Sequence, residues 1–84
     1  MTNRCVLDAE VVNEILRVSA RQRESLMTYC RQIMETVHEP SESRFQDATG
    51  RWIEQRIIQG WCFSYWLDSP VSEVRIVGIQ RIKR

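Results

Sequence analysis

Apolar and polar positions follow two different periods along this chain, and the period changes near its middle. In the first half, apolar residues recur three and four positions apart over residues 11–16 and 26–37, as on one face of an α-helix. The second half holds three runs rich in β-branched and aromatic residues, which are typical of strands. These runs cover residues 52–58, 61–67 and 74–79. A short apolar run, Arg4–Leu7, favours one more strand before the first helix, so the pattern predicts the order β-α-α-β-β-β.

Local signals mark the ends of the two predicted helices. Asp8 precedes the first helix and is predicted to cap it, because its carboxylate can accept hydrogen bonds from free N–H groups of the first turn. Ser19 followed by Gln22 resembles a capping box and predicts that a second helix begins there. No Gly or Pro separates the two helices, so a single bent helix is the alternative. Pro40 and the polar stretch 41–49 end the helical half.

Turn signals separate the three later strands. Gln59-Gly60 predicts a hairpin between the first two, and Asp68-Ser69-Pro70 predicts the next turn, where the missing N–H of proline does no harm. The middle run is the most aromatic and is suited to a central strand. We therefore expect an α+β fold, with a helical hairpin packed on one face of a mainly antiparallel sheet, as a single domain over residues 1–84.

Charge is distributed unevenly along the chain. The formal net charge is only +1, which excludes a general polyanion binder. Residues 1–50 carry eight acidic side chains against six arginines, whereas residues 51–84 carry five arginines and one lysine against three acids. Arginine suits bidentate contact with phosphate, so this asymmetry indicates a basic functional face in the second half.

The remaining chemistry-bearing residues exclude several classes. Cys5, Cys30 and Cys62 form no CxxC pair, and their odd number favours reduced thiols, packed as small hydrophobes, in a cytoplasmic protein. No apolar run reaches the roughly 18 residues of a membrane span. No nucleotide-binding or metal-ligand motif occurs, so we expect no cofactor and no metal. The one histidine, His38, excludes a nuclease that uses a pair of histidines.

Three segments carry a resemblance to a known family. Gly60–Trp66 is similar to a strand of pattern G-[YW]-R-hydrophobic-x-[YF], Glu73–Ile79 is similar to a last core strand, and Gln80–Arg84 is a basic ending. Together with the order β-α-α-β-β-β, these segments resemble the RelE/ParE superfamily of type II toxin–antitoxin toxins. The resemblance spans nearly the whole chain.

The resemblance implies a toxin that a cognate antitoxin neutralises in a hetero-oligomer. RelE-like toxins cleave mRNA on the ribosome, whereas ParE-like toxins poison DNA gyrase, and both arrest growth. Our first expectation is a RelE-like ribosome-dependent mRNA endoribonuclease, and the alternative is a ParE-like gyrase inhibitor. A third alternative is a non-toxic, decayed protein-binding module of the same fold.

The resemblance also implies catalytic candidates. Arg81 matches the family's basic residue after the last core strand and would stabilise a scissile phosphate. Arg56 matches a basic residue on the strand before the hairpin, and Glu54 then occupies a position that is Lys in RelE and is a candidate general base. Cys62 replaces the hairpin arginine, and the sequence ends before the place where RelE-like toxins keep a functional Tyr. Both departures count against RelE-type cleavage more than against ParE-like action.

Further residues are candidates for contact with nucleic acid or another target. They are Arg51, Lys83, Arg84 and the hydroxyl of Tyr65. Each has a structural alternative: the basic ending is a solvated tail, Arg56 and Arg51 are surface charges, and Tyr65 packs with the aromatic residues around it. Arg75 is expected to pair with a carboxylate, either Glu54 or Glu73.

Overall fold

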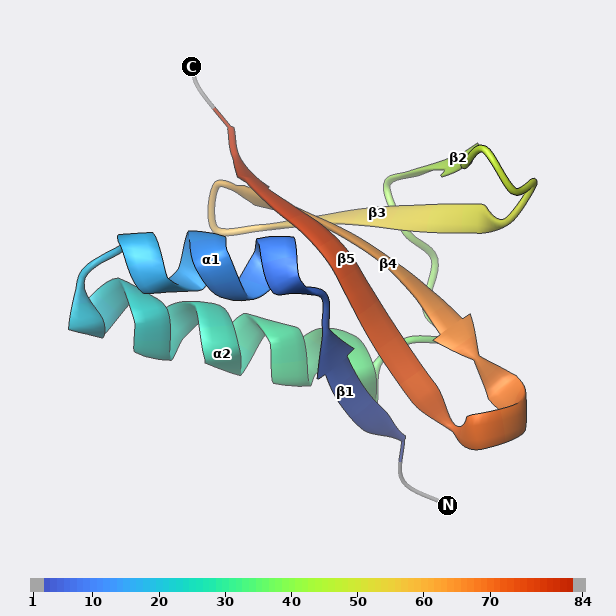
Figure 1. Cartoon of the computed structure of the whole chain (residues 1–84), viewed down its shortest axis with the longest axis horizontal. Helices are drawn as coiled ribbons and strands as arrows, with labels where there is room; N and C mark the ends of the chain where they lie inside the picture. Colours follow the sequence, from blue (N-terminus) through green and yellow to red (C-terminus); the bar gives the residue numbers. More distant parts are fainter. Residues whose placement is uncertain (1–2, 83–84) are drawn as a thin grey trace.

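The computed structural model describes residues 3–82, and its elements follow the predicted order with one added strand and a short 3-10 helix in the predicted second turn (Figure 1). The elements are β1 (Arg4–Leu7), α1 (Ala9–Arg17), α2 (Ala20–Glu35), β2 (Ser43–Gln46), β3 (Trp52–Ile58), β4 (Trp61–Asp68), the short 3-10 helix η1 (Ser69–Val71) and β5 (Glu73–Arg81). The predicted bounds of β3 are therefore correct, and those of β4 and β5 are correct in place but short by one and three residues. None of the helices in this part of the chain is long and apolar enough to cross a membrane.

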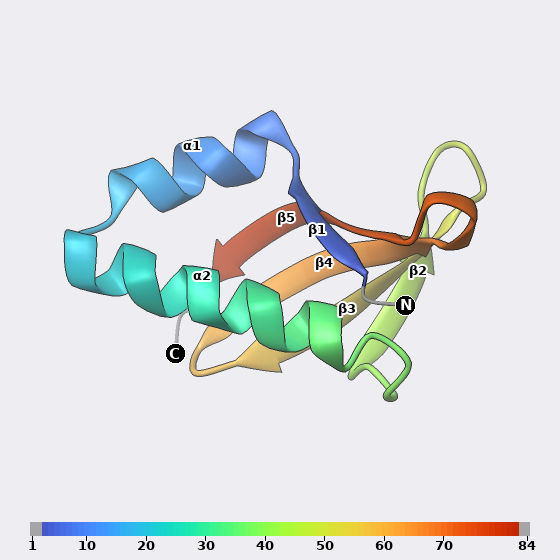
Figure 2. The same ribbon diagram turned by 90° about the horizontal axis from the view of Figure 1, so that it is seen from below.

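The strands form one mixed sheet in the order β1-β5-β4-β3-β2. β1 runs parallel to β5, and all the other neighbours are antiparallel. Figure 2 shows both helices on the same side of this sheet. The predicted α+β fold, its helical hairpin, its mainly antiparallel sheet and the central place of β4 are thus confirmed.

The addition is β2, which lies inside the stretch 41–49 that the sequence led us to expect as a loop. It pairs with β3 through a tight turn built on Asp47. The Asp47 carboxylate accepts hydrogen bonds from Thr49 N (2.9 Å), Thr49 Oγ1 (2.6 Å) and Arg51 N (3.0 Å), and these bonds, that of the Thr49 side chain above all, lower its pKa. Gly50 supplies a positive φ of 84°. A side-chain-built turn of this kind forms a hairpin from polar residues, which hydrophobic patterning does not detect.

The helix ends match the prediction at one position and not at the other. Ser19 Oγ accepts a hydrogen bond from Gln22 N (3.2 Å), so the predicted cap of α2 is confirmed. Asp8 occupies the N-cap of α1, but its side chain accepts no N–H of the helix, so the predicted capping bond is wrong. Val18 and Ser19 both have extended backbone, with ψ of 168° and 160°, which separates two helices and removes the bent-helix alternative.

The β3–β4 turn forms as predicted, with positive φ at Gln59 (49°) and Gly60 (83°). Two consecutive residues with positive φ make the turn that matches the twist of a tight hairpin. This turn fixes the register of β3 against β4, and therefore decides which side chains of the two strands share a face.

The core lies between the helices and one face of the sheet, here called the helix face. Its buried members are Val11, Ile15, Leu26, Cys30, Ile33, Trp61, Phe63, Tyr65, Val74, Ile76 and Ile79. Side chains alternate along β4, so the opposite face, here called the open face, carries Cys62, Ser64 and Trp66. The predicted apolar faces of the two helices are wider than the area that packs against the sheet. Leu16 is therefore 59% exposed and Met27 is 41% exposed.

Candidate functional site

The register of the β3–β4 hairpin divides the predicted site residues between the two faces of the sheet. Glu54 pairs with Tyr65, and Arg56 pairs with the core residue Phe63, so both lie on the helix face. Cys62, which stands where the resemblance expects an arginine, pairs with Ile57 on the open face. A site that unites Glu54 and Arg56 with the Cys62 position therefore does not form on one face.

The Glu54 carboxylate contacts a neighbouring side chain at each of its two oxygen atoms. Its Oε1 accepts a hydrogen bond from Ser41 Oγ (3.3 Å), and Arg44 Nε lies 3.3 Å from its Oε2. Oε2 is nevertheless buried and has no partner in hydrogen-bonding geometry. The ion pair with Arg44 is half-exposed, so it adds little stability.

Arg56 reaches from β3 to the end of α2. Its guanidinium donates to Thr36 Oγ1, to Thr36 O (3.0 Å) and to Glu39 O (3.1 Å). These acceptors belong to the C-terminal end of the helix, where carbonyl groups lack partners within the helix. Arg56 is therefore more than the plain surface charge that one interpretation of the sequence suggested, because it joins the sheet to α2.

Tyr65 lies in the core with no exposed surface, so the structure does not place it on a contact surface. Its hydroxyl is buried and has no hydrogen-bond partner. Burial raises the pKa of this hydroxyl. The nearby Arg56 guanidinium lowers this pKa, and the carboxylates of Glu54 and Glu42 raise it. The Arg56 guanidinium carbon lies 5.6 Å from the Tyr65 ring centre. Three of the predicted residues, Glu54, Arg56 and Tyr65, are thus gathered in one cluster.

Arg81 lies apart from that cluster, at the end of β5, and it is exposed. Its partner across the sheet is Trp61, and its guanidinium carbon lies 5.3 Å from that ring centre. A groove of about 430 Å³ between α1 and β5 brings Glu10 and Glu14 near Arg81. Arg17 lines the same groove and pairs with Glu14 (3.4 Å), so the Glu10 carboxylate is the one left to weaken the attraction of this end of the sheet for phosphate.

A second arginine–aromatic group lies on the open face. The guanidinium carbon of Arg51 lies 3.9 Å from the centre of the Trp66 ring, and that of Arg75 lies 6.0 Å from it. Arg75 also pairs with Glu73 (3.1 Å) rather than with Glu54, which decides between the two predicted partners. Arg51 is thus on the opposite face from Arg56 and Glu54.

Two predicted residues, Lys83 and Arg84, lie outside the described part of the chain. One residue beside the cluster was missed, because Arg44 belongs to the unpredicted strand β2. The turn sequence Asp47-Ala48-Thr49-Gly50 is the signal that would have found it. Within residues 3–82, no group of three His, Cys, Asp or Glu side chains is placed to hold a metal ion.

Comparison with solved structures identifies the fold. The chain matches, over 100% of its own length and 99% of the other, a chain of the archaeal RelE–RelB complex from Pyrococcus horikoshii OT3, with a TM-score of 0.71 and 15% identity. It also matches a double arginine-to-alanine mutant of the E. coli toxin RelE in the free state, with a TM-score of 0.68 and 10% identity over 96% of this chain and 84% of the other. The intact E. coli RelBE toxin–antitoxin complex gives 0.62 and 12%, over 99% of this chain and 100% of the other.

No protein-family profile matches the sequence, and no curated protein sequence is similar to it. The fold is that of the RelE toxins, as the resemblance implied, and identities of this size show the fold alone.

Proposed function

We propose that this protein is the toxin of a toxin–antitoxin system, which arrests growth when free and is inactive when a cognate antitoxin is bound. The observation that carries the proposal is the match over the whole chain to RelE structures both free and in complex with antitoxin. The cytoplasm, where translated mRNA and gyrase are found, is the location that this function requires.

The finer proposal is ribosome-dependent cleavage of mRNA. Cleavage of RNA through its own 2′-OH needs a group that takes this proton, a cation near the phosphate and an acid for the leaving oxygen. The helix-face cluster contains one side chain of each kind, in Glu54, Arg56 and Tyr65. Arg81 is an additional exposed cation for the RNA backbone.

One observation favours the alternative of a DNA gyrase inhibitor. Glu54 and Arg56 are engaged by hydrogen bonds within the protein, and an uncharged thiol, that of Cys62, stands where the resemblance expects a cation. Inhibition of gyrase needs a binding surface rather than a catalytic set. The same observation is compatible with a non-toxic binding module.

Induced expression in bacteria separates these functions. Growth is followed together with mRNA cleavage in translated regions and with gyrase–DNA breaks, with and without co-expression of a candidate antitoxin sought in the neighbouring reading frames. We expect arrest with cleaved mRNA, and its relief by the cognate antitoxin. Arrest with trapped gyrase breaks and intact mRNA would support the alternative, and normal growth with folded protein would refute the toxin proposal.

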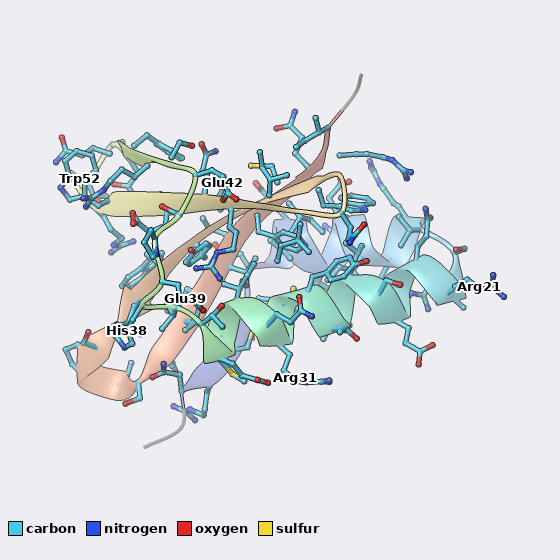
Figure 3. All side chains as sticks on the ribbon, turned by 180° about the vertical axis from the view of Figure 1, so that it is seen from behind. Arg21, Arg31, His38, Glu39, Glu42 and Trp52 are labelled. Carbon is cyan, nitrogen blue, oxygen red and sulfur yellow. The ribbon has the colours of Figure 1, made fainter. Side chains whose placement is uncertain are left out.

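Arg81→Ala tests the exposed cation in the same assay. We expect weaker arrest with the fold retained. The matched control is Arg21→Ala, because Arg21 is an exposed arginine in the first turn of α2, at the opposite end of the helix from the strand β3 contacts of Arg56 (Figure 3). Equal toxicity of the two variants would remove Arg81 from the proposed site.

A further inference from the structure

Two buried oxygen atoms without hydrogen-bond partners lie on adjacent residues of the sheet. They are the Tyr65 hydroxyl and Glu54 Oε2, and the two residues are direct partners across β3 and β4. Glu54 Oε2 keeps an ion-pair partner, because Arg44 Nε lies 3.3 Å from it. The Tyr65 hydroxyl is the atom that needs an explanation, since buried polar atoms in folded proteins nearly always have hydrogen-bond partners. The Arg56 guanidinium carbon lies 5.6 Å from the Tyr65 ring centre and Glu54 is the cross-strand partner of Tyr65, so the ring lies beside the polar cluster.

The cluster is covered by the segment His38–Glu42, here called the strap. The strap leaves the end of α2 and reaches β3, and Figure 3 shows Glu39 near the helix end and Glu42 beside β3. Two of its contacts involve the cluster itself, because Glu39 O accepts from Arg56 Nη2 (3.1 Å) and Ser41 Oγ donates to Glu54 Oε1 (3.3 Å).

The other contacts of the strap attach Glu42 to the edge of β3. Glu42 N donates to Gln55 O (3.0 Å), and the Glu42 carboxylate accepts from Ile57 N (3.1 Å). Val37, just before the strap, packs on the core, whereas four of the five strap residues are exposed. A segment held by solvent-accessible polar contacts opens at a lower free energy than the core.

We propose that the strap is a movable cover over a catalytic set of Glu54, Arg56 and Tyr65, which takes an RNA phosphodiester when the strap lifts. This assignment rests on the mRNA cleavage proposed above. Lifting the strap breaks the bonds of Glu39 to Arg56 and of Ser41 to Glu54, so the motion that uncovers the set also removes one partner from its guanidinium and one from its carboxylate. Arg56 keeps its bonds to Thr36, and Glu54 keeps its ion pair with Arg44.

The reaction of this set balances without a cofactor. The Glu54 carboxylate takes the proton of the 2′-OH, and the 2′-oxygen attacks phosphorus. The P–O5′ bond breaks as the P–O2′ bond forms, Arg56 stabilises the charge on the phosphoryl oxygens, and the Tyr65 hydroxyl gives its proton to the leaving 5′-oxygen. The products are a 2′,3′-cyclic phosphate and a 5′-hydroxyl, and the proton on Glu54 returns to the Tyr65 oxygen through water.

The catalytic test uses the two tyrosines of the chain as a matched pair. Tyr65→Phe removes one oxygen atom, and we expect it to lower the rate of mRNA cleavage by about 100-fold or more, the usual effect of losing a general acid. Tyr29→Phe, at the other tyrosine, is expected to leave the rate unchanged. A Tyr65→Phe variant that cleaves as fast as the parent would overturn the assignment alone. A parent that does not cleave mRNA would overturn the proposed cleavage function and the assignment with it.

The strap is tested without any activity assay. In the Tyr29→Phe background Tyr65 is the only tyrosine, and its nitration by tetranitromethane reports access to the cluster. We expect nitration faster than global unfolding allows, and a further increase of about 10-fold in Glu42→Ala at equal stability toward urea. Glu24→Ala, on the exposed side of α2, is the control. If the rate of Tyr65 nitration equals the rate that global unfolding allows in both variants, the proposal of a movable strap is wrong.

Discussion

The unpaired hydroxyl of Tyr65 leads to a prediction with an unusual sign: Tyr65→Phe stabilises the protein. Replacing a buried tyrosine normally removes a hydrogen bond and lowers stability. Here the hydroxyl is buried, which raises its pKa, and it has no partner in hydrogen-bonding geometry, although the Arg56 guanidinium lies close enough to lower that pKa in part. Burying an unpaired hydroxyl costs about 1–3 kcal/mol relative to water.

The substitution removes this cost and leaves a void smaller than a methyl group, which costs at most about 1 kcal/mol. We therefore expect the free energy of unfolding to rise by about 1 kcal/mol. In a domain of this size, that rise increases the melting temperature by roughly 4–8 °C.

The assay is urea unfolding, with the slope of free energy against urea compared between variants. An unchanged slope shows that the midpoint shift is a change in stability. Tyr29→Phe is the control, because Tyr29 is only partly buried, and we expect it to change stability by less than about 0.5 kcal/mol. A loss of about 1 kcal/mol in Tyr65→Phe would refute the reasoning, since it would mean that the hydroxyl has a hydrogen-bond partner in solution.

This result bears on the proposed site as well. A catalytic side chain is often held in an environment that costs stability, and removing it then stabilises the fold while activity falls. Tyr65→Phe is expected to show both effects. A Tyr65→Phe variant that gains stability and keeps full activity would mean that the hydroxyl lowers stability without serving catalysis.

Three further predictions concern the fold. Arg56→Met is expected to lower the free energy of unfolding by about 2 kcal/mol, because it leaves helix-end carbonyls without donors, whereas the exposed Arg21→Met has little effect; equal midpoints in urea would contradict this. Burial, with a smaller effect of a nearby thiol, raises the pKa of Cys30 to about 12. The neutral thiol therefore contributes its full stability below about pH 9, and this contribution is lost as the pH rises toward 12. We expect the free energy of unfolding to fall by about 2 kcal/mol between about pH 8 and about pH 10.5, and to depend less on pH in Cys30→Ala. Gly60→Ala is expected to cost about 1–2 kcal/mol through its φ of +83° alone, since a Cβ there meets open space, whereas Gly78→Ala, with a Cβ in ordinary contact, costs less; the reverse order in thermal unfolding would refute the assigned turn.

The candidate site was only partly predictable. Single residues were identified by type, and Glu54, Arg56 and Tyr65 do meet in one cluster. Their environment was not predictable, because the strap and Arg44 come from a stretch whose structure depends on hydrogen bonds rather than on apolar periodicity. The distance of Arg81 from that cluster also depends on the sheet order, which places β4 between β3 and β5.

The sequence alone determined the type and order of most elements. Apolar periodicity, the Ser19 cap and the Gln59-Gly60 turn are local signals, and a local signal acts on the backbone near it whatever the rest of the chain does. Tertiary structure decided the rest: the parallel pairing of β1 with β5, the strand β2, and the face on which each arginine lies. Strand side chains alternate, so a register difference of one residue moves an arginine from the helix face to the open face. That register is fixed by contacts between residues far apart in the sequence, and it separates Arg56 from the Cys62 position.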